Sequence, residues 1–188
     1  MIKIVKDFLP KPLFKRLLAI VEDELFNWEW QNNTIQNPYT LKGDNNFKLG
    51  KLIYSDPRLD INVNGDYFEV RDKFKNIFQT VADFQNEIKP FKKLVKLKLN
   101  LYPNQGEQIK HGRHVDISIT GKPDESIITS VFNFHTCNGY TVIDENDKEQ
   151  IIPSIANQIV IFDNAYHYGV TQSDIPRRIV LNMNVAIK

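Results

Sequence analysis

The first half of the chain shows the three- and four-residue spacing of apolar side chains that is typical of amphipathic helices. Residues 11–26 carry one such stripe, and Pro10 and Pro12 lie at its start, where a missing backbone N–H costs nothing. Residues 66–88 carry a second stripe, which Pro90 ends. The pattern therefore predicts two helices before residue 90.

After residue 90 the apolar period changes from about four to two, which is typical of strands. Residues 94–102 alternate, with Leu97, Leu99 and Leu101 on one face and polar side chains on the other. Glycine and proline residues separate the later apolar segments, as expected for turns. The same pattern predicts short strands at 115–120, 127–135, 140–143, 149–152, 158–162 and 177–187.

Helices followed by many short strands predict an α+β chain that is mainly β. The number of strands suits a sandwich or a double-sheet jelly roll, with the N-terminal helices packed on the outside of one sheet. Residues 31–50 are rich in Asn and Gly and predict a loop with room for a short strand. We expect one domain, 1–188, with a helical support at 1–90 and the jelly-roll core at 91–188.

Composition narrows the classes of protein. With 24 Lys and Arg against 23 Asp and Glu, the net charge is +1, which disfavours a general nucleic-acid binder. Cys137 is the single cysteine, so no intrachain disulfide can form and a reducing, cytoplasmic location is expected. No segment reaches the roughly 20 apolar residues that span a bilayer, and none resembles a signal peptide, so no membrane partner is expected. Composition does not determine the oligomeric state.

The residues that could bind a metal or take part in catalysis lie in the second half of the chain. His114 and Asp116 are two apart at the start of a strand pattern, so they would point to the same side. An apolar strand pattern leads to His167, and Arg177 and Arg178 follow about ten residues later. Each of these patterns alone is common by chance. Together they provide two imidazoles and a carboxylate, the ligand set of non-haem Fe(II) oxygenases, and an arginine suited to a carboxylate.

At this point the chain resembles the 2-oxoglutarate/Fe(II)-dependent oxygenases of the prolyl-4-hydroxylase-like type, and its small size is similar to phage and marine-bacterial members. Ile143, Gln158 and Val180 depart from residues that the family often has, which leaves the subfamily open. The resemblance implies a double-stranded β-helix, a cupin-like jelly roll. The matching segments are residues 4–23, 101–104, 113–116, 138–141, 153–162, 167–170 and 178–182.

The resemblance also implies roles for single residues. His114, Asp116 and His167 would be the catalytic metal ligands that hold Fe(II). Tyr102 would contribute to the 2-oxoglutarate pocket, and either Arg177 or Arg178 would bind the distal carboxylate of that co-substrate. Dioxygen would be the second co-substrate, with ascorbate as an optional addition.

Strand alternation helps to choose between the two arginines. Arg178 shares a mixed face with Val180, Asn182 and Asn184, whereas the alternate positions 179, 181, 183 and 185 are wholly apolar and suit packing against the helices. We therefore prefer Arg178 as the anchor and expect Arg177 to point outward. The same argument places Asn100, Tyr102 and Asn133 inward.

The implied activity is hydroxylation of a C–H bond in a peptide, with proline as one candidate residue, or in a small molecule. Two alternatives stay open: a non-catalytic cupin-like binding module, and a nucleic-acid dealkylating oxygenase, which the neutral charge disfavours. We expect His111 at the rim and His135 in a structural role. Lys89, Lys92, Lys93, Lys96 and Lys98 favour a solvated face over an edge of the substrate entrance. Specificity would lie in residues 31–60, 105–113 and 121–125.

Overall fold

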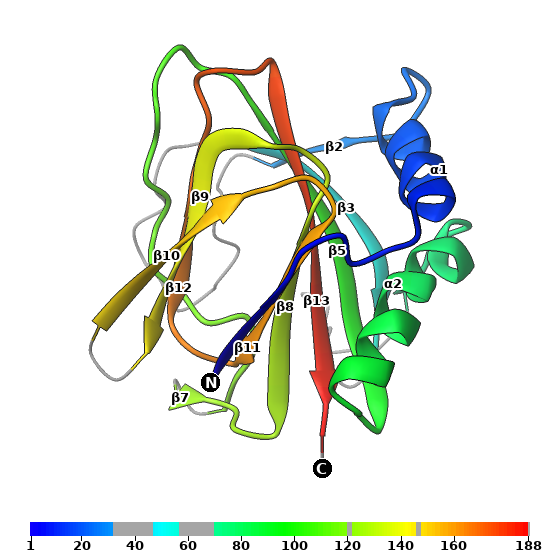
Figure 1. Cartoon of the computed structure of the whole chain (residues 1–188), viewed down its shortest axis with the longest axis vertical. Helices are drawn as coiled ribbons and strands as arrows, with labels where there is room; N and C mark the ends of the chain where they lie inside the picture. Colours follow the sequence, from blue (N-terminus) through cyan, green and yellow to red (C-terminus); the bar gives the residue numbers. More distant parts are fainter. Residues whose placement is uncertain (32–46, 57–69, 120–121, 146–147, 188) are drawn as a thin grey trace, which may run out of the picture.

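The computed structural model describes residues 1–31, 47–56, 70–119, 122–145 and 148–187 (Figure 1). Within them, two helices and a series of strands follow one another in this order: β1 (Ile2–Val5), α1 (Lys11–Glu22), β2 (Glu29–Gln31), β3 (Lys48–Ser55), β4 (Val70–Arg71), α2 (Lys75–Ile88), β5 (Lys93–Pro103), β6 (Ser118–Ile119), β7 (Lys122–Pro123), β8 (Ile127–Asn133), β9 (Cys137–Glu145), β10 (Lys148–Ser154), β11 (Gln158–Asp163), β12 (His167–Val170) and β13 (Arg177–Ala186).

The strands form antiparallel sheets. The largest has eight strands in the order β1-β11-β8-β13-β5-β3-β2, with β4 attached to β3, and a smaller one has the order β10-β9-β12. A short pair, β6 and β7, lies apart. Figure 1 shows the small sheet facing the large one on one side, while α1 and α2 lie on the other side, beside β3 and β5. The expectation of a mainly β chain is confirmed.

The main hydrophobic core lies between the helices and the large sheet. Leu17 and Val21 of α1 and Phe78 and Val81 of α2 are fully buried in it. From the sheet it receives the residues that the alternation assigned to the helix side, which are Leu97, Leu99 and Leu101 of β5 and Ile179, Leu181, Met183 and Val185 of β13. Val180, one position out of phase, belongs to a second core on the opposite face. The predicted facing of β5 and β13 is therefore confirmed.

Both helices begin or end inside their predicted ranges. α1 starts after Pro10 as expected but ends at Glu22 instead of residue 26. The predicted range 66–88 was too long, because Val70–Arg71 form a strand with β3 and α2 begins at Lys75. The carboxylate of Asp72 accepts the backbone N–H of Phe74 at 2.9 Å, a local turn that separates the strand from the helix. Residues 66–69 lie outside the described residues.

Several strands were missed or misplaced. The loop predicted at 31–50 ends in β3, an eight-residue strand that pairs with β5. The strand predicted at 115–120 exists only as Ser118–Ile119 within the described residues, because the preceding residues pair through the isolated bridge His114↔His167. β12, which begins at His167, was not predicted as a strand. These elements all border the site described next.

Candidate metal and co-substrate site

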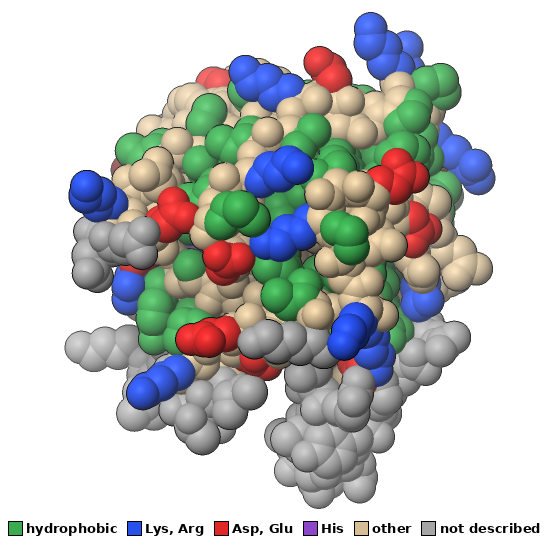
Figure 2. Space-filling view, turned by 60° about the horizontal axis from the view of Figure 1, so that its bottom comes forward, with side chains coloured by type: hydrophobic (Ala, Val, Ile, Leu, Met, Phe, Trp, Pro, Cys, Tyr) green, Lys and Arg blue, Asp and Glu red, His purple; other side chains and the backbone are tan. Residues whose placement is uncertain are grey.

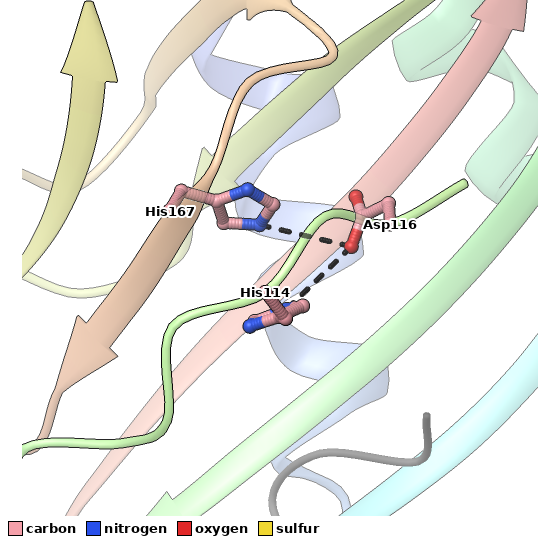
Figure 3. Close-up of side chains that lie close together, drawn as sticks. All are labelled: His114, Asp116 and His167. Carbon is pink, nitrogen blue, oxygen red and sulfur yellow. Dashed lines mark ion pairs between the residues drawn. The ribbon is translucent and has the colours of Figure 1, made fainter. Parts of the chain in front are cut away.

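His114, Asp116 and His167 converge although they come from separate elements. His114 and Asp116 lie in the segment between β5 and β6, and His167 opens β12. Reciprocal backbone hydrogen bonds of 2.9 and 2.8 Å join His114 to His167. Nε2 of each imidazole lies 3.7 Å from Oδ1 of Asp116, and the three potential ligand atoms are all within 4.8 Å of one another (Figure 3). A single cation could contact all three atoms.

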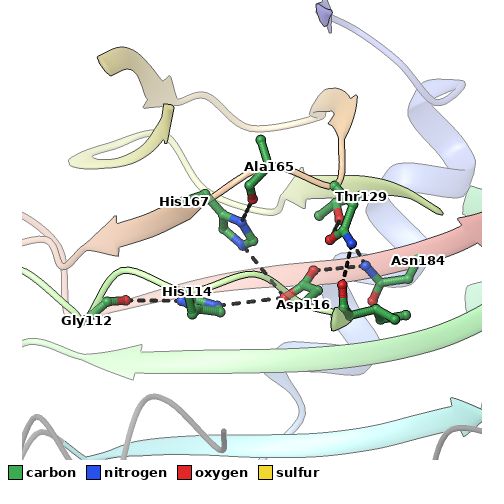
Figure 4. A network of polar contacts seen from close by, with 9 residues as sticks. Gly112, His114, Asp116, Thr129, Ala165, His167 and Asn184 are labelled. Atoms are coloured by element: carbon green, nitrogen blue, oxygen red, sulfur yellow. Dashed lines mark hydrogen bonds and ion pairs between the residues drawn. The ribbon is translucent and has the colours of Figure 1, made fainter. Parts of the chain in front are cut away.

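Hydrogen bonds around the cluster orient each of these side chains. Nδ1 of His114 lies 3.1 Å from the carbonyl of Gly112, and Nδ1 of His167 lies 3.0 Å from the carbonyl of Ala165 (Figure 4). Because a carbonyl can only accept, each Nδ1 carries a proton, and in a neutral imidazole the lone pair is therefore on Nε2. Nε2 of His167 is buried and has no hydrogen-bond partner among the described residues. This arrangement fits a divalent metal held by two imidazoles and a carboxylate.

The carboxylate of Asp116 is also held through its second oxygen, Oδ2. Asn184 donates from Nδ2 to Oδ2 of Asp116 at 2.9 Å and to Oγ1 of Thr129 at 3.1 Å. Oδ1 of Asp116 is thereby left to face both imidazoles. Asn184 is fully buried, so its amide has little freedom to turn away.

The protonation states also suit metal binding at neutral pH. Burial, with the nearby His167, lowers the pKa of His114 to about 4, so its imidazole is neutral. Burial alone would raise the pKa of Asp116, but electrostatic interactions with His167 and His114 and the Asn184 hydrogen bond outweigh it and leave that pKa below its ordinary value. A neutral imidazole and an ionised carboxylate are the forms that bind metals.

The cluster opens into a cavity of about 450 Å³, a volume that includes its opening to solvent. His114 and His167 line it together with Tyr102, Asn182 and Arg178. Arg178 is 2% exposed. Arg178 is therefore a buried cationic side chain in the wall of the cavity that His114 and His167 also line.

The guanidinium of Arg178 is held by acceptors on all sides. It donates to the carbonyls of Tyr140 and Val170 at 3.2 Å each and to Oγ1 of Thr141 at 3.1 Å. Longer contacts of 3.3 and 3.4 Å reach Ser154 Oγ and Asn133 Oδ1. All of these acceptors are neutral, so the charge of the guanidinium is oriented but not neutralised by them. A guanidinium whose charge is not neutralised attracts a carboxylate.

The structure separates the predicted residues into those that line the cavity and those that do not. Tyr102, Asn182 and Arg178 line it. Asn133 is buried and accepts a long hydrogen bond from Arg178. Asn100 is buried as well and pairs with Val180 of β13.

Arg177 points the other way. It is exposed and lies 3.4 Å from the carboxylate of Glu22 on α1. The arrangement of the two arginines agrees with the alternation argument.

Sequence reasoning missed further cavity residues. His111, expected at the rim, is 5% exposed and lines the cavity with its ring 4.9 Å from that of Tyr102. Thr141 and Lys48 also line the cavity and were not predicted. Lys48 fell within the predicted loop at 31–50, where no period could assign it a face. His135 accepts the backbone N–H of Ile179 and contacts Glu22, in line with a structural role.

Neither described helix is both long and apolar enough to cross a membrane.

Comparisons with known proteins identify the fold. No family model matches the chain, and no curated protein matches it in sequence. Among solved structures, a 2OG-Fe(II) oxygenase family oxidoreductase from Burkholderia pseudomallei is similar at a TM-score of 0.68 and 9% identity, covering 98% of this chain and 85% of that one.

Two prolyl hydroxylases are similar as well. The prolyl-4-hydroxylase of Pseudomonas putida has a TM-score of 0.60 at 14% identity, and the match covers 100% of this chain and 92% of the Pseudomonas chain. The prolyl hydroxylase of Trichoplax adhaerens, solved with a hypoxia inducible factor peptide, has a TM-score of 0.63 at 13% identity, covering 98% and 83%. The chain therefore has the fold of 2OG-Fe(II) oxygenases, as the resemblance implied.

Proposed function

We propose that this chain is an Fe(II)- and 2-oxoglutarate-dependent dioxygenase that hydroxylates a C–H bond, built on a double-stranded β-helix in a single cytoplasmic domain. One observation carries the proposal: His114 and His167, which cluster with Asp116, line a single cavity together with the buried Arg178. The fold alone would not support it, because one fold can host many functions.

Each residue has a role that follows from its geometry. His114, Asp116 and His167 would hold Fe(II) through the two Nε2 atoms and Oδ1, while Arg178 would bind the distal carboxylate of 2-oxoglutarate. Tyr102 and Thr141 would shape the co-substrate pocket. When bound, iron with 2-oxoglutarate and dioxygen supplies the oxidising chemistry. The protein orients these groups and keeps the His114 imidazole neutral and the Asp116 carboxylate ionised.

Peptidyl hydroxylation is the substrate class nearest to the comparisons, because the Trichoplax enzyme was solved with a peptide. Nucleic-acid dealkylation has less support. On the face shown in Figure 2, basic side chains are separated by acidic and apolar ones and form no continuous patch among the coloured atoms. A phosphate backbone would favour an extended basic surface.

The experiment that tests the proposal is anaerobic titration of the protein with Fe(II) and 2-oxoglutarate. A metal-to-ligand absorption band should form, and it should be lost in His167→Ala and Asp116→Ala. His135→Gln is the matched control, because His135 contacts Glu22 and Ile179 outside the cavity. On admission of oxygen, the wild type should form succinate. Folded protein that gives no band would instead favour the cupin-like binding module.

A further inference from the structure

The segment that carries His114 and Asp116, residues 109–116, runs beside β12 at the edge of the small sheet and is called the edge segment below (Figure 3). Two isolated bridges attach it to β12. The strands of the large sheet, in contrast, pair over several consecutive residues. The position of His114 and Asp116 relative to His167 therefore depends on how the edge segment is held.

The spacing of the two bridges shows a one-residue bulge between them. Along the edge segment the bridged residues are four positions apart, whereas their partners along β12 are three apart. A bulge of this kind changes the direction of the side chains that follow it. His111 and His114 would point to opposite faces of a regular strand, yet both line the cavity. The bulge at Gly112 and Arg113 thus directs both imidazoles to the side of the metal site.

Arg113 joins this bulge to the neighbouring strands through its side chain. Its guanidinium carbon lies 4.1 Å from the centre of the Tyr166 ring, and its Nε forms an ion pair with Asp144 of β9. The carbonyl of Tyr166 accepts the backbone N–H of Asp144 at 2.9 Å, which keeps these two partners together. Arg113 directly precedes His114, and Tyr166 directly precedes His167. The contact therefore connects the neighbours of two metal ligands.

A second contact of the same kind lies at the other bridge. Nζ of Lys110 lies 4.1 Å from the centre of the Tyr168 ring, and the hydroxyl of Tyr168 donates to Glu149 of β10 at 3.0 Å. Glu149 pairs with Asp144 in the small sheet. Two cations of the edge segment thus stack on two tyrosines, with a carboxylate at each end. The repetition indicates that side chains hold the edge segment where the backbone pairing is interrupted.

Of the two cations, Arg113 has the more direct influence on the metal ligands. It is adjacent to His114, and its planar guanidinium combines a ring contact with an ion pair. A single cation–π contact or surface ion pair is weak. Here both act on one residue of a bulge, next to a ligand, so their loss is expected to displace that ligand more than it destabilises the fold.

We propose, on the premise of the function proposed above, that Arg113 is a positioning residue of the metal site. By stacking on Tyr166 and pairing with Asp144, it holds the bulge against the small sheet and so keeps His114 and Asp116 beside His167 before a metal binds.

The test is titration of the full-length, metal-free protein with Co(II), followed by the visible absorption of the bound ion, at a temperature where every variant is folded. Arg113→Met should raise the Kd by about 3- to 30-fold, because metal binds only to the docked edge segment and the variant loses both contacts that dock it. Tyr166→Leu should also raise it, whereas Tyr166→Phe retains the ring and should stay within about twofold of the wild type. Arg16→Met, which removes an exposed arginine from α1, is the matched control and should also stay within about twofold.

A second measurement reports on the same docking without metal. Hydrogen bonds of 2.9 and 2.8 Å join the backbones of His114 and His167. In metal-free Arg113→Met, these two amide hydrogens should exchange faster than in the wild type by about 3- to 30-fold, because the edge segment opens more often. Unaltered exchange would overturn the proposal.

The Kd also distinguishes positioning from a general effect on stability. A role in stability alone would lower the unfolding midpoint of metal-free Arg113→Met and leave the Kd of the folded protein equal to that of Arg16→Met, and this result would overturn the proposal. The absorption band with Fe(II) and 2-oxoglutarate separates it from the proposed function. A wild type that gives the band, with an unaltered Kd in Arg113→Met, contradicts only the role of Arg113, whereas a folded wild type that binds no metal contradicts the proposed function itself.

Discussion

Asn184 binds Oδ2 of Asp116 at 2.9 Å, while Oδ1 of the same carboxylate faces both His114 and His167 at 3.7 Å. One amide from β13 therefore determines which oxygen of the carboxylate is presented to a metal. Thr129 holds the amide in turn, since its Oγ1 accepts from the same Nδ2. A residue outside the cluster of His114, Asp116 and His167 thus controls the orientation of its carboxylate.

Replacing this amide should weaken metal binding without removing a ligand. We expect Asn184→Ala to raise the Kd for Mn(II) or Fe(II) by about 10- to 100-fold, because outer hydrogen bonds of metal ligands typically contribute this much. Asn182→Ala is the control, since Asn182 lies on the same face of β13 and makes no hydrogen bond to Asp116 among the described residues. Calorimetric titration of both variants measures the difference, and equal affinities would contradict the role of Asn184.

Arg177 and Arg178 should differ sharply in their effect on 2-oxoglutarate. Arg178→Met removes a buried charge from the cavity, so we expect the Kd for 2-oxoglutarate to rise at least about 30-fold. Arg177→Ala breaks only a surface ion pair with Glu22 and should leave that Kd within about twofold of the wild type. Titrating 2-oxoglutarate into the Fe(II)-loaded variants distinguishes them. A larger rise in Kd for Arg177→Ala than for Arg178→Met would show that Arg177 is the anchor instead.

Much of the fold could be predicted because facing is a local property. The period of β13 separated Ile179 and Leu181 on the helix side from Arg178 on the cavity side, and the structure has the same division. β3 was missed because its cavity face holds Lys48 and Gly50, which break the apolar alternation. A strand whose inward face serves a cavity does not have the pattern of a strand that packs on a core.

The site shows a similar limit. His114, Asp116 and His167 were found from spacing and resemblance, since a ligand set has characteristic residue types. The positions of Asn184 beside Asp116 and of Lys48 in the cavity wall depend on register between distant strands, and no local pattern contains that register. His111 was misplaced for the same reason, because the backbone bond from its N–H to the Gly169 carbonyl draws it into the cavity wall.

Two glycines near Arg178 should differ in their tolerance of a methyl group. A Cβ at Gly139 would lie 3.0 Å from the Val170 carbonyl oxygen and 3.2 Å from Cδ of Arg178, so Gly139→Ala must displace one of them. We expect a loss of about 1–3 kcal/mol in the free energy of unfolding, together with weaker 2-oxoglutarate binding.

Gly169→Ala is the matched control for that substitution. Its Cβ would be 3.4 Å from Nδ1 of His111 and 3.9 Å from Nη1 of Arg178, which are ordinary contacts. Denaturant unfolding and 2-oxoglutarate titration of both variants make the comparison. If Gly169→Ala proved the more harmful of the two, the crowding argument for Gly139 would fail.

The ion pairs of Glu22 should make part of the stability depend on pH. Oε1 of Glu22 lies 2.9 Å from Nε2 of His135 and 3.4 Å from Nε of Arg177, joining α1 to the large sheet. Burial would raise the pKa of the Glu22 carboxyl, but the His135 hydrogen bond and the charges of His135 and Arg177 outweigh it and leave the pKa below the ordinary 4.5.

The sign of the effect follows from that direction. Because the folded protein holds the Glu22 proton less tightly than the unfolded chain, this carboxylate stabilises the fold above pH 4.5 and loses its contribution as the pH falls through the folded pKa. In urea unfolding, Glu22→Gln should therefore be less stable than the wild type near neutral pH, and the gap should close on acidification below 4.5. Glu24→Gln, an exposed neighbour, should show no such pH-dependent gap. A gap for Glu22→Gln that stays constant or widens in acid would show that the carboxylate does not stabilise this junction between helix and sheet.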